Sequence, residues 1–471
     1  MLHHNLKVNP YPYQEEGIIQ GLKWKRFFLG DEPGLGKTLQ SIGVVDTAGA
    51  YPALVICPSS LKINWKREFE KFTDKKALVL DNGNATTWPY LLQMGMFHVA
   101  VVNYESLKKY FVWEIKGSSR SFRLKDVVFA QQIKMFRSVI LDESHRVKDA
   151  STQQTKFAKG ICIGKEYIIL LSGTPVVNRP EDLVSQLSIM ERLKEFGGKS
   201  QFLIDFADGR NLNVLSGLLY SRCMIRREKA KVLKQLPDKT RCDLYVNISN
   251  EEEYNTAQEN LEEYLREYRG CTDEEVRRKM RMKALVQFMA LRSIAAHGKV
   301  KQAVDFIRVF LESGKKLIVF CSLHDIVDEL KKAFPKAVTV TGRDSPVMKQ
   351  AAVDAFQQNP EVKLIVCSIK AAGVGLTLTA ASNVAFIEFP WTYADCLQCE
   401  DRAHRIGQKD NVTCYYLIGS GTIDHYLYQI IYKKRSIANE IMASDDEIPT
   451  DRQYFDELVN SMFQLKFDGN L

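Results

Sequence analysis

Residues 30–38 read Gly-Asp-Glu-Pro-Gly-Leu-Gly-Lys-Thr, and these residue types at this spacing are suited to holding phosphate groups. The stretch follows an apolar run at residues 27–29 and precedes a segment of good helix formers. We therefore expect a strand, a glycine loop and a helix in that order. One position departs from the phosphate-loop pattern G-x-x-x-x-G-K-[ST], because Asp31 stands where the first glycine belongs.

The last five residues of this stretch, residues 34–38, have expected roles. Backbone N–H groups at Gly34, Leu35 and Gly36 surround phosphate oxygens, and the helix N-terminus adds the positive end of its dipole. Lys37 reaches the β- and γ-phosphates, while the hydroxyl of Thr38 binds Mg²⁺. The loop thus predicts a nucleoside triphosphate held with a magnesium ion.

Two adjacent carboxylates, Asp142 and Glu143, follow an apolar run at residues 138–141. Carboxylates at the end of a buried strand are costly in a core and useful beside a metal ion. We expect Asp142 to coordinate Mg²⁺ and Glu143 to orient and deprotonate the water that attacks the γ-phosphoryl group. An exposed acidic turn is the alternative. His145 is expected to couple this site to neighbouring motifs rather than to act as a base.

A Ser-Gly-Thr-Pro stretch at residues 172–175 also ends an apolar run. Small hydroxyl groups there could sense the state of the phosphates, although a plain turn would have the same sequence. The position after a buried strand favours the functional interpretation.

Near the C-terminus, residues 398–408 contain two arginines, Arg402 and Arg405, three positions apart. On a helix this spacing puts both side chains on one face. Guanidinium groups that reach a γ-phosphate across a cleft stabilise the charge of the transition state. The alternative is an amphipathic surface helix with ordinary ion pairs, and Gln398 together with the Ile-Gly-Gln ending favours the catalytic interpretation.

The elements that must position these residues are short apolar strands alternating with helical stretches, which is the pattern of parallel α/β sheets. The expected strands lie at residues 53–57, 97–102, 138–141 and 167–171, and again at 316–321, 337–340, 363–367 and 383–387. Residues 184–300 are poor in Gly and Pro and dense in charge, so we expect mainly helix there. The expected domains are an N-terminal lobe at 1–183, a helical insertion or linker at 184–300, a C-terminal lobe at 301–445 and a tail at 446–471.

Composition limits the class of protein. The 471 residues are 45% hydrophobic and carry a net charge of +8, which suits a soluble two-domain protein with either a polyanionic partner or a plain solvated basic surface. No apolar run is long enough to span a bilayer, and no signal peptide is visible. Cys57, Cys321 and Cys367 lie in expected strands, so we expect reduced and buried thiols. The pair Cys396 and Cys399 is not expected to bind zinc.

With these motifs in order, the chain resembles the Snf2 family of superfamily 2 helicase-like ATPases from residue 12 to about residue 435. The motifs that carry the resemblance are Tyr13-Gln14 with Gly17, residues 31–38, Cys57-Pro58-Ser59-Ser60 with Trp65, Asn103-Tyr104-Glu105, and residues 142–145, 171–175, 319–322, 368–378 and 398–408. Within the family, residues 142–145 and residues 172–175 with Arg179-Pro180 are most similar to the annealing-helicase branch and its short bacterial or phage relatives.

The resemblance implies an α/β fold of two RecA-like lobes, each a parallel sheet flanked by helices, with a helical insertion between them. ATP and Mg²⁺ would bind in the cleft between the lobes. Gln14 would read the adenine edge, and Gln398 would belong to the nucleotide-binding residues. Alternating closure of the lobes would convert ATP hydrolysis into steps along DNA.

The implied grip on DNA is through backbone phosphates, independent of base sequence. The expected contact residues are Ser59, Ser60, Thr174, Gly373, Gly375 and Thr377. For residues 371–378, a plain strand-to-helix turn is the alternative. Basic and aromatic residues interleave at positions 108–125, which fits either nucleic-acid contact or a hairpin that packs its aromatics on the first lobe.

We therefore expect an ATP-dependent translocase on duplex or forked DNA, which remodels or reanneals DNA, as in DNA repair, or displaces bound protein. Two alternatives stay open: a strand-separating helicase, and a nucleotide-gated clamp on a protein or DNA partner. No targeting domain is visible, so substrate choice would come from the lobes, the insertion or a partner protein. The expected location is the cytoplasm of a bacterial or phage-infected cell, or the nucleus in a eukaryote, with no membrane association.

Overall fold

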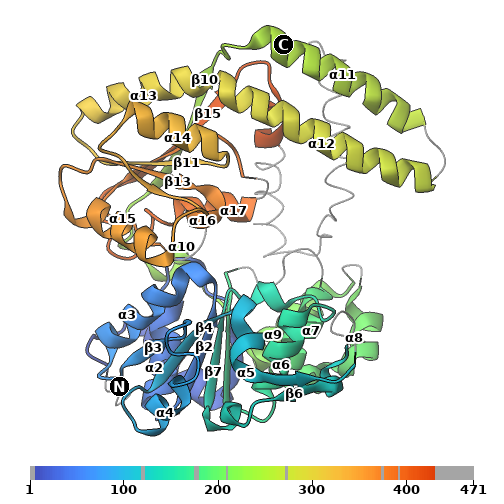
Figure 1. The fold of residues 1–471 in the computed structure, drawn as a ribbon, viewed down its shortest axis with the longest axis vertical. Coiled ribbons are helices and arrows are strands. Elements are labelled where there is room, and N and C mark those ends of the chain that lie inside the picture. Colours follow the sequence, from blue (N-terminus) through green and yellow to red (C-terminus); the bar gives the residue numbers. More distant parts are fainter. Residues whose placement is uncertain are drawn as a thin grey trace. The chain divides into compact units, whose positions relative to one another are not determined.

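The computed structural model describes residues 6–117, 122–173, 180–207, 210–270, 274–372, 376–390 and 393–429. These residues form two compact units, the first ending at Gln235 and the second beginning at Leu236 (Figure 1). Each unit is built on one parallel sheet with helices packed against it, so the expected α/β fold with two parallel-sheet lobes is confirmed.

The first unit contains a seven-stranded sheet in the order β3-β4-β2-β7-β8-β1-β9, and every neighbouring pair in it is parallel. Its strands are β1 (Arg26–Leu29), β2 (Ala53–Cys57), β3 (Ala77–Val79), β4 (Val99–Asn103), β7 (Ser138–Asp142), β8 (Tyr167–Leu171) and β9 (Met224–Ile225). The central strands are runs of Val, Ile and Leu that are buried throughout, as expected for a parallel sheet covered on both faces.

The helices of the first unit are α1 (Pro12–Trp24), α2 (Lys37–Thr47), α3 (Lys62–Phe72), α4 (Trp88–Gln93), α5 (Leu107–Phe111), α6 (Gln153–Cys162), α7 (Asp182–Ile189), α8 (Gly198–Phe206), α9 (Leu212–Arg222) and α10 (Lys229–Val232). A separate antiparallel hairpin joins β5 (Val112–Ile115) to β6 (Val127–Phe129). The carboxyl ends of the parallel strands lie along one edge of the sheet, and this arrangement brings together the loops that follow β1, β7 and β8.

The second unit contains a six-stranded sheet in the order β10-β15-β14-β11-β13-β12, also parallel at every pairing. Its strands are β10 (Lys239–Val246), β11 (Leu317–Cys321), β12 (Val338–Val340), β13 (Leu364–Ser368), β14 (Asn383–Phe386) and β15 (Val412–Gly419). Its helices are α11 (Glu251–Gly270), α12 (Glu274–Gly298), α13 (Val300–Glu312), α14 (His324–Ala333), α15 (Pro346–Gln358), α16 (Ile369–Ala372) and α17 (Tyr393–Glu400).

The long helices α11 and α12 lie side by side in Figure 1, and residues from both, such as Leu261 and Phe288, share one buried apolar cluster. Residues 184–300 were expected to be mainly helical, and most of the described ones are. They also contain two strands, β9 and β10, each of which joins a different sheet. The two units meet in sequence inside this segment, between Gln235 and Leu236.

Further expectations concern cysteines and membranes. Cys57, Cys321 and Cys367 are fully buried, as predicted. Cys396 and Cys399 are also buried, and the described residues contain no cluster of three or more metal-ligating side chains. Among the described helices, none combines the length and the apolar character that crossing a bilayer requires. The predicted tail at residues 446–471 lies outside the described residues.

Candidate active site

The predicted phosphate loop lies between β1 and α2, where the backbone must turn sharply at the end of a strand. Gly34 and Gly36 have φ angles of 90° and 75°, in the left-handed region that side chains disfavour. α2 begins at Lys37, and its N-cap residue, Gly36, has no side chain that could accept from the N–H groups of the first turn. A phosphate group fits this loop because it would accept from those N–H groups.

The side chain of Lys37 crosses the loop and donates to the backbone oxygen of Asp31, with 2.6 Å between Nζ and O. Burial lowers the pKa of Lys37, and the carboxylates of Glu143, Asp31 and Asp142 oppose that shift. The ammonium group is therefore held over the loop among three carboxylates. Thr38, the predicted Mg²⁺ ligand, is half-buried in the first turn of α2.

The carbonyl oxygen of Leu35 accepts hydrogen bonds from two residues of α1. The hydroxyl of Tyr13 and the amide of Gln14 both donate to it, each at 3.1 Å. The Gln14 side-chain oxygen also accepts from the backbone N–H of Tyr11, at 3.0 Å. Gln14, predicted to read adenine, is therefore buried against the phosphate loop, and its contact with a base stays a prediction.

Asp142 is the last residue of β7. β7 pairs with β8, and β8 pairs with β1, the strand that precedes the phosphate loop, so Asp142 and the loop lie at the same edge of the sheet. The indole N–H of Trp65 donates to Oδ2 of Asp142 at 2.8 Å, and the N–H of Glu143 donates to Oδ1 of the same carboxylate at 2.9 Å. Burial, followed by the charge of Glu143, raises the pKa of Asp142 to about 6. A buried carboxylate of this kind suits a bound cation, which would favour its ionised form.

Glu143 has a left-handed backbone, with φ 52° and ψ 52°, which is uncommon for a residue with a side chain. Its Oε2 lies 3.4 Å from Nδ1 of His145, and that nitrogen also lies 3.3 Å from the hydroxyl of Ser172. His145 thus lies between the acidic motif and the loop after β8, and its predicted role in coupling the two motifs stays a prediction. The local strain at Glu143 is consistent with a residue whose direction is set by function.

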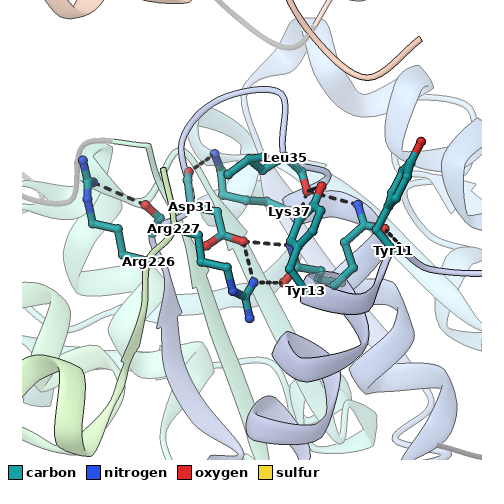
Figure 2. A network of polar contacts seen from close by, with 10 residues as sticks. Tyr11, Tyr13, Asp31, Leu35, Lys37, Arg226 and Arg227 are labelled. Carbon is teal, nitrogen blue, oxygen red and sulfur yellow. Dashed lines mark hydrogen bonds and ion pairs between the residues drawn. The ribbon is translucent and has the colours of Figure 1, made fainter. Parts of the chain in front are cut away.

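A second layer of this site was missed at the sequence level. It is formed by residues 226–229, which follow β9 (Figure 2). Nη1 of Arg227 lies 3.0 Å from Oδ2 of Asp31 and 3.1 Å from Oε1 of Gln40, and Gln40 also donates to the same Asp31 oxygen at 2.8 Å. Burial raises the pKa of Asp31, and Arg227 is the largest opposing influence. Asp31, which replaces a consensus glycine, is thus the centre of a buried network.

The neighbouring Arg226 donates to the carbonyl oxygens of Gly30 and Gly173, at 3.3 and 3.2 Å. It therefore bridges the loops that follow β1 and β8 (Figure 2). The Arg-Arg pair stands in a charge-rich stretch of the sequence, and nothing in its local pattern distinguishes it from surface charge.

Gly17 was quoted only as part of a motif. A Cβ there would lie 2.1 Å from Oε1 of Gln40, so the network leaves no room for a side chain.

In the second unit, Arg402 and Arg405 do not lie on a helix, which corrects the prediction. α17 ends at Glu400, and residues 401–407 form turns. Both guanidinium groups nevertheless converge, because each donates to the carbonyl oxygen of Leu376, at 3.3 and 3.1 Å. Arg402 also donates to the backbone oxygen of Gln398 at 2.9 Å. We call residues 401–407 the arginine turn.

Gln408 stabilises the end of this turn. Its amide donates to the carbonyl oxygens of Ala381 and Ala403, at 2.8 and 3.2 Å, and its side-chain oxygen accepts from the N–H groups of Lys409 and Asp410. The Ile-Gly-Gln ending therefore fixes the backbone that carries the two arginines. The side chain of Gln398 is half-buried in α17, and its predicted contact with nucleotide stays a prediction.

The residues predicted to contact DNA are only partly described. Ser59 is exposed and Ser60 half-buried at the carboxyl end of β2, and Thr377 is half-buried. Thr174, Gly373 and Gly375 lie outside the described residues. The structure therefore places the two serines on the same sheet edge as the phosphate loop, and their role stays a prediction.

The basic and aromatic stretch at residues 108–125 leads into the hairpin β5–β6. Tyr110, Phe111 and Phe122 are buried in the core of the first unit, which agrees with the packing alternative. Trp113 differs, because it is 81% exposed at a register shift between Val112 and Glu114.

Comparison with known proteins gives two family matches. Residues 14–300 match the family described as SNF2-related domain, and residues 298–407 match the helicase conserved C-terminal domain. The chain is 30% identical to a SWI/SNF-related matrix-associated actin-dependent regulator of chromatin subfamily A-like protein 1 homolog of Caenorhabditis elegans, over 93% of this chain and 63% of the relative. It is also 30% identical to the human DNA annealing helicase and endonuclease ZRANB3, over 94% of this chain and 41% of the relative.

An uncharacterized ATP-dependent helicase of Mycoplasma genitalium is 31% identical, over 94% of this chain and 43% of its own length. The chain thus spans between about two fifths and two thirds of the curated relatives named here. Among solved structures, it is similar to the Sulfolobus solfataricus SWI2/SNF2 ATPase core in complex with dsDNA, with 26% identity, a TM-score of 0.43, and coverage of 95% of this chain and 96% of that one.

Proposed function

Since the chain belongs to the SNF2-related family, we propose that it is an ATP-driven motor that moves along duplex DNA without using base sequence. The observation that supports this best is the convergence of three loops at one edge of the first sheet. Lys37 lies after β1, Asp142 ends β7 and Glu143 follows it, and Ser172 follows β8. These are the residue types that phosphoryl transfer from ATP to water requires.

In this proposal, Lys37 exchanges the backbone oxygen of Asp31 for the phosphates of ATP. Thr38 and Asp142 would hold Mg²⁺, which would supply positive charge beside the phosphate oxygens. Glu143 orients the attacking water and accepts its proton, and His145 relays the state of the site to Ser172. Burial lowers the pKa of Lys37, and the charges of Glu143, Asp31 and Asp142 oppose that shift and so favour the ammonium form.

Arg402 and Arg405 complete the reaction by stabilising negative charge on the γ-phosphoryl group. They belong to the second unit, whereas the phosphate loop belongs to the first. Hydrolysis therefore depends on both units acting on one nucleotide, and product release frees them to move. Contacts from residues such as Ser59 and Ser60 to DNA phosphates would turn that cycle into steps along the duplex.

The motor is proposed to remodel or reanneal DNA, or to displace bound protein. The named relatives include a DNA annealing helicase. No wedge element that would separate strands was predicted from the sequence, and this favours translocation over unwinding. A forked duplex is the substrate on which reannealing and simple translocation differ most.

The test is the rate of ATP hydrolysis by the purified chain with no nucleic acid, with single-stranded DNA, with blunt duplex and with forked duplex. Stimulation by duplex supports the translocase, and a further preference for the fork supports reannealing. Stimulation by single strands alone would replace the proposal with a strand-separating helicase. No stimulation by any DNA would overturn it in favour of a clamp or a motor that acts on protein.

A further inference from the structure

The segment that connects the two units begins as part of the phosphate-loop structure. Alternate N–H groups along β1 and the loop donate to alternate carbonyl oxygens of this segment: Phe28 to Cys223, Gly30 to Ile225 and Glu32 to Arg227, at 2.7, 2.7 and 3.0 Å. This spacing is that of a parallel ladder, so the loop continues the β1–β9 pairing beyond the ends of the strands. The backbone of the connecting segment therefore moves with the phosphate loop.

Side chains reinforce this first attachment. Arg227 pairs with the buried carboxylate of Asp31, and the N–H of Lys229 donates to Oε2 of Glu32 at 2.7 Å. Asp31 has no exposed surface, so the loss of Arg227 would remove the ion pair of a buried carboxylate and leave the neutral amide of Gln40 as a remaining donor. Residues 226–229 are thus fixed to the loop by both backbone and charge.

The same segment is attached at its other end to the arginine turn. Arg241 binds Glu400 through two parallel hydrogen bonds of 2.6 and 2.7 Å, and Nζ of Lys239 lies 2.7 Å from the same carboxylate. Glu400 is the last residue of α17 and has no exposed surface. Burial would raise the pKa of Glu400, but Lys239 and Arg241 outweigh it and lower the pKa to about 2. The carboxylate is therefore ionised and firmly held.

A third contact is made by His404, the histidine of the arginine turn. Nε2 of His404 donates to the carbonyl oxygen of Pro237 at 2.8 Å. His404 stands between Arg402 and Arg405 in the sequence. Residues 237–241 therefore contact Glu400, which directly precedes the arginine turn, and His404, which lies in the middle of the turn.

We propose that residues 226–241 form a tether that couples the phosphate loop to the arginine turn. Its positioning residues are Arg227, within the tether, and Glu400, the residue of α17 to which the tether is attached. The proposal rests on the proposed function, because it assigns the coupling between the two sets of ATP-site residues. Residues 230–236 are the covalent connection between the attachments, so a shift of the loop on nucleotide binding reaches the turn along the chain itself. The proposed coupling thus follows bonded and hydrogen-bonded atoms and does not depend on sequence co-variation between the two sites.

The tether is tested by lengthening it. A Gly-Ser-Gly-Ser insertion after Gln235 leaves both attachments intact and adds slack between them. The control carries the same insertion after Gly314, in the exposed turn that follows α13. Hydrogen–deuterium exchange is measured in the full chain with and without ADP and Mg²⁺, and DNA-stimulated hydrolysis is measured in parallel.

In the parental chain and the Gly314 control, ADP with Mg²⁺ is expected to slow exchange at residues 30–38 and also at residues 239–246 and 400–408, by at least about threefold. In the Gln235 variant, the slowing at residues 30–38 stays and the slowing in the other two segments is lost. DNA-stimulated kcat falls at least about tenfold, with KM for ATP unchanged. Two outcomes would overturn the tether. Either ADP with Mg²⁺ does not slow exchange at residues 239–246 and 400–408 in the parental chain, or the slowing there is still present after the Gln235 insertion.

The exchange measurement needs only ADP and Mg²⁺, so it separates this inference from the proposed function. A parental chain that is not stimulated by DNA but shows the expected exchange pattern would keep the tether and remove the motor. If the Gln235 variant does not bind ADP, Glu400→Gln cuts the second attachment without changing the chain length. Its control is Glu388→Gln, a change at another buried carboxylate of the second unit, which accepts from the N–H groups of Ser322 and Leu323. Loss of coupling in both variants would contradict the tether, and loss only in Glu400→Gln would support it.

Discussion

The carboxylate of Asp31 and the guanidinium group of Arg227 form an ion pair with 3.0 Å between Oδ2 and Nη1, although the two residues are 196 positions apart in the sequence. Asp31 has no exposed surface, and the Arg227 side chain is 15% exposed. The pair fixes the start of the phosphate loop to the segment that leads into the second unit. The residue that departs from the phosphate-loop consensus therefore supplies the buried ion pair between the loop and the segment that follows β9.

Replacing Arg227 with Met should destabilise the first unit by about 3–5 kcal/mol, because it breaks the ion pair of the buried Asp31 carboxylate and leaves it with the neutral amide of Gln40 as a donor. Adding Asp31→Asn should recover part of that loss, since no buried charge is then left. Urea unfolding of both variants and of the Asp31→Asn single variant measures the coupling energy. The control is Arg343→Met, which breaks a half-exposed pair with Asp328 and should cost less than about 1 kcal/mol. If Arg227→Met and Arg343→Met lower the free energy of unfolding by the same amount, the buried pair stabilises the chain no more than the half-exposed pair does.

Replacing Glu143 with Gln should leave ATP binding intact and slow hydrolysis by at least about a hundredfold, because the amide cannot accept the proton of the attacking water. The substitution keeps the size of the side chain, so the left-handed backbone at this position should be preserved. Single-turnover hydrolysis and binding of a fluorescent ATP analogue separate the two effects. Parental turnover in this variant would remove Glu143 from the role of base.

The two arginines should respond differently to replacement by Ala. Arg405 is half-buried and its guanidinium group donates to the carbonyl oxygen of Leu376, so Arg405→Ala should lose DNA-stimulated turnover with little change in the melting temperature. Arg402 is 6% exposed and donates to the carbonyl oxygens of Gln398 and Leu376, so Arg402→Ala should lose turnover and also lower the stability of the second unit by about 1–3 kcal/mol. Thermal unfolding beside ATPase assays distinguishes them. Unchanged hydrolysis in Arg405→Ala would exclude it from catalysis.

The stability of the second unit should depend on pH through Glu400. Its pKa is about 2 in the folded chain against an ordinary value of 4.5, because Lys239 and Arg241 outweigh the effect of burial. Since the folded pKa is lowered, the contribution is fully present above about pH 5 and is lost as the pH falls toward 2. The shift corresponds to about 3 kcal/mol. Urea unfolding between pH 5 and pH 2 should therefore show a weaker pH dependence in Glu400→Gln than in the parental chain, and identical slopes would contradict the assignment.

The sequence was sufficient wherever a short local pattern determines the structure. Runs of Val, Ile and Leu predicted the eight strands within two residues, since a parallel strand is buried on both faces and needs no polar alternation. The phosphate loop and the residues at the ends of β7 and β8 could be predicted as parts of a nucleotide site. Glycine with lysine, or paired carboxylates, directly after an apolar run seldom serve another purpose. The convergence of these loops follows from the parallel sheet that the same pattern predicts.

The tertiary structure alone decided the strands and contacts that depend on distant partners. β9 is only two residues long, and β10 alternates half-buried and exposed positions, so both resemble irregular chain until they pair with β1 and β15. The prediction that Arg402 and Arg405 lie on a helix was wrong, because contacts with Leu376 and the bonds of Gln408 fix a turn instead. Arg227 has no local signal, and Glu400 lies in the motif at residues 398–408 without any sign there of its ion pairs with Lys239 and Arg241. Their roles come from buried charges that meet across segments far apart in the sequence, and the pairing of such charges is a property of the folded chain.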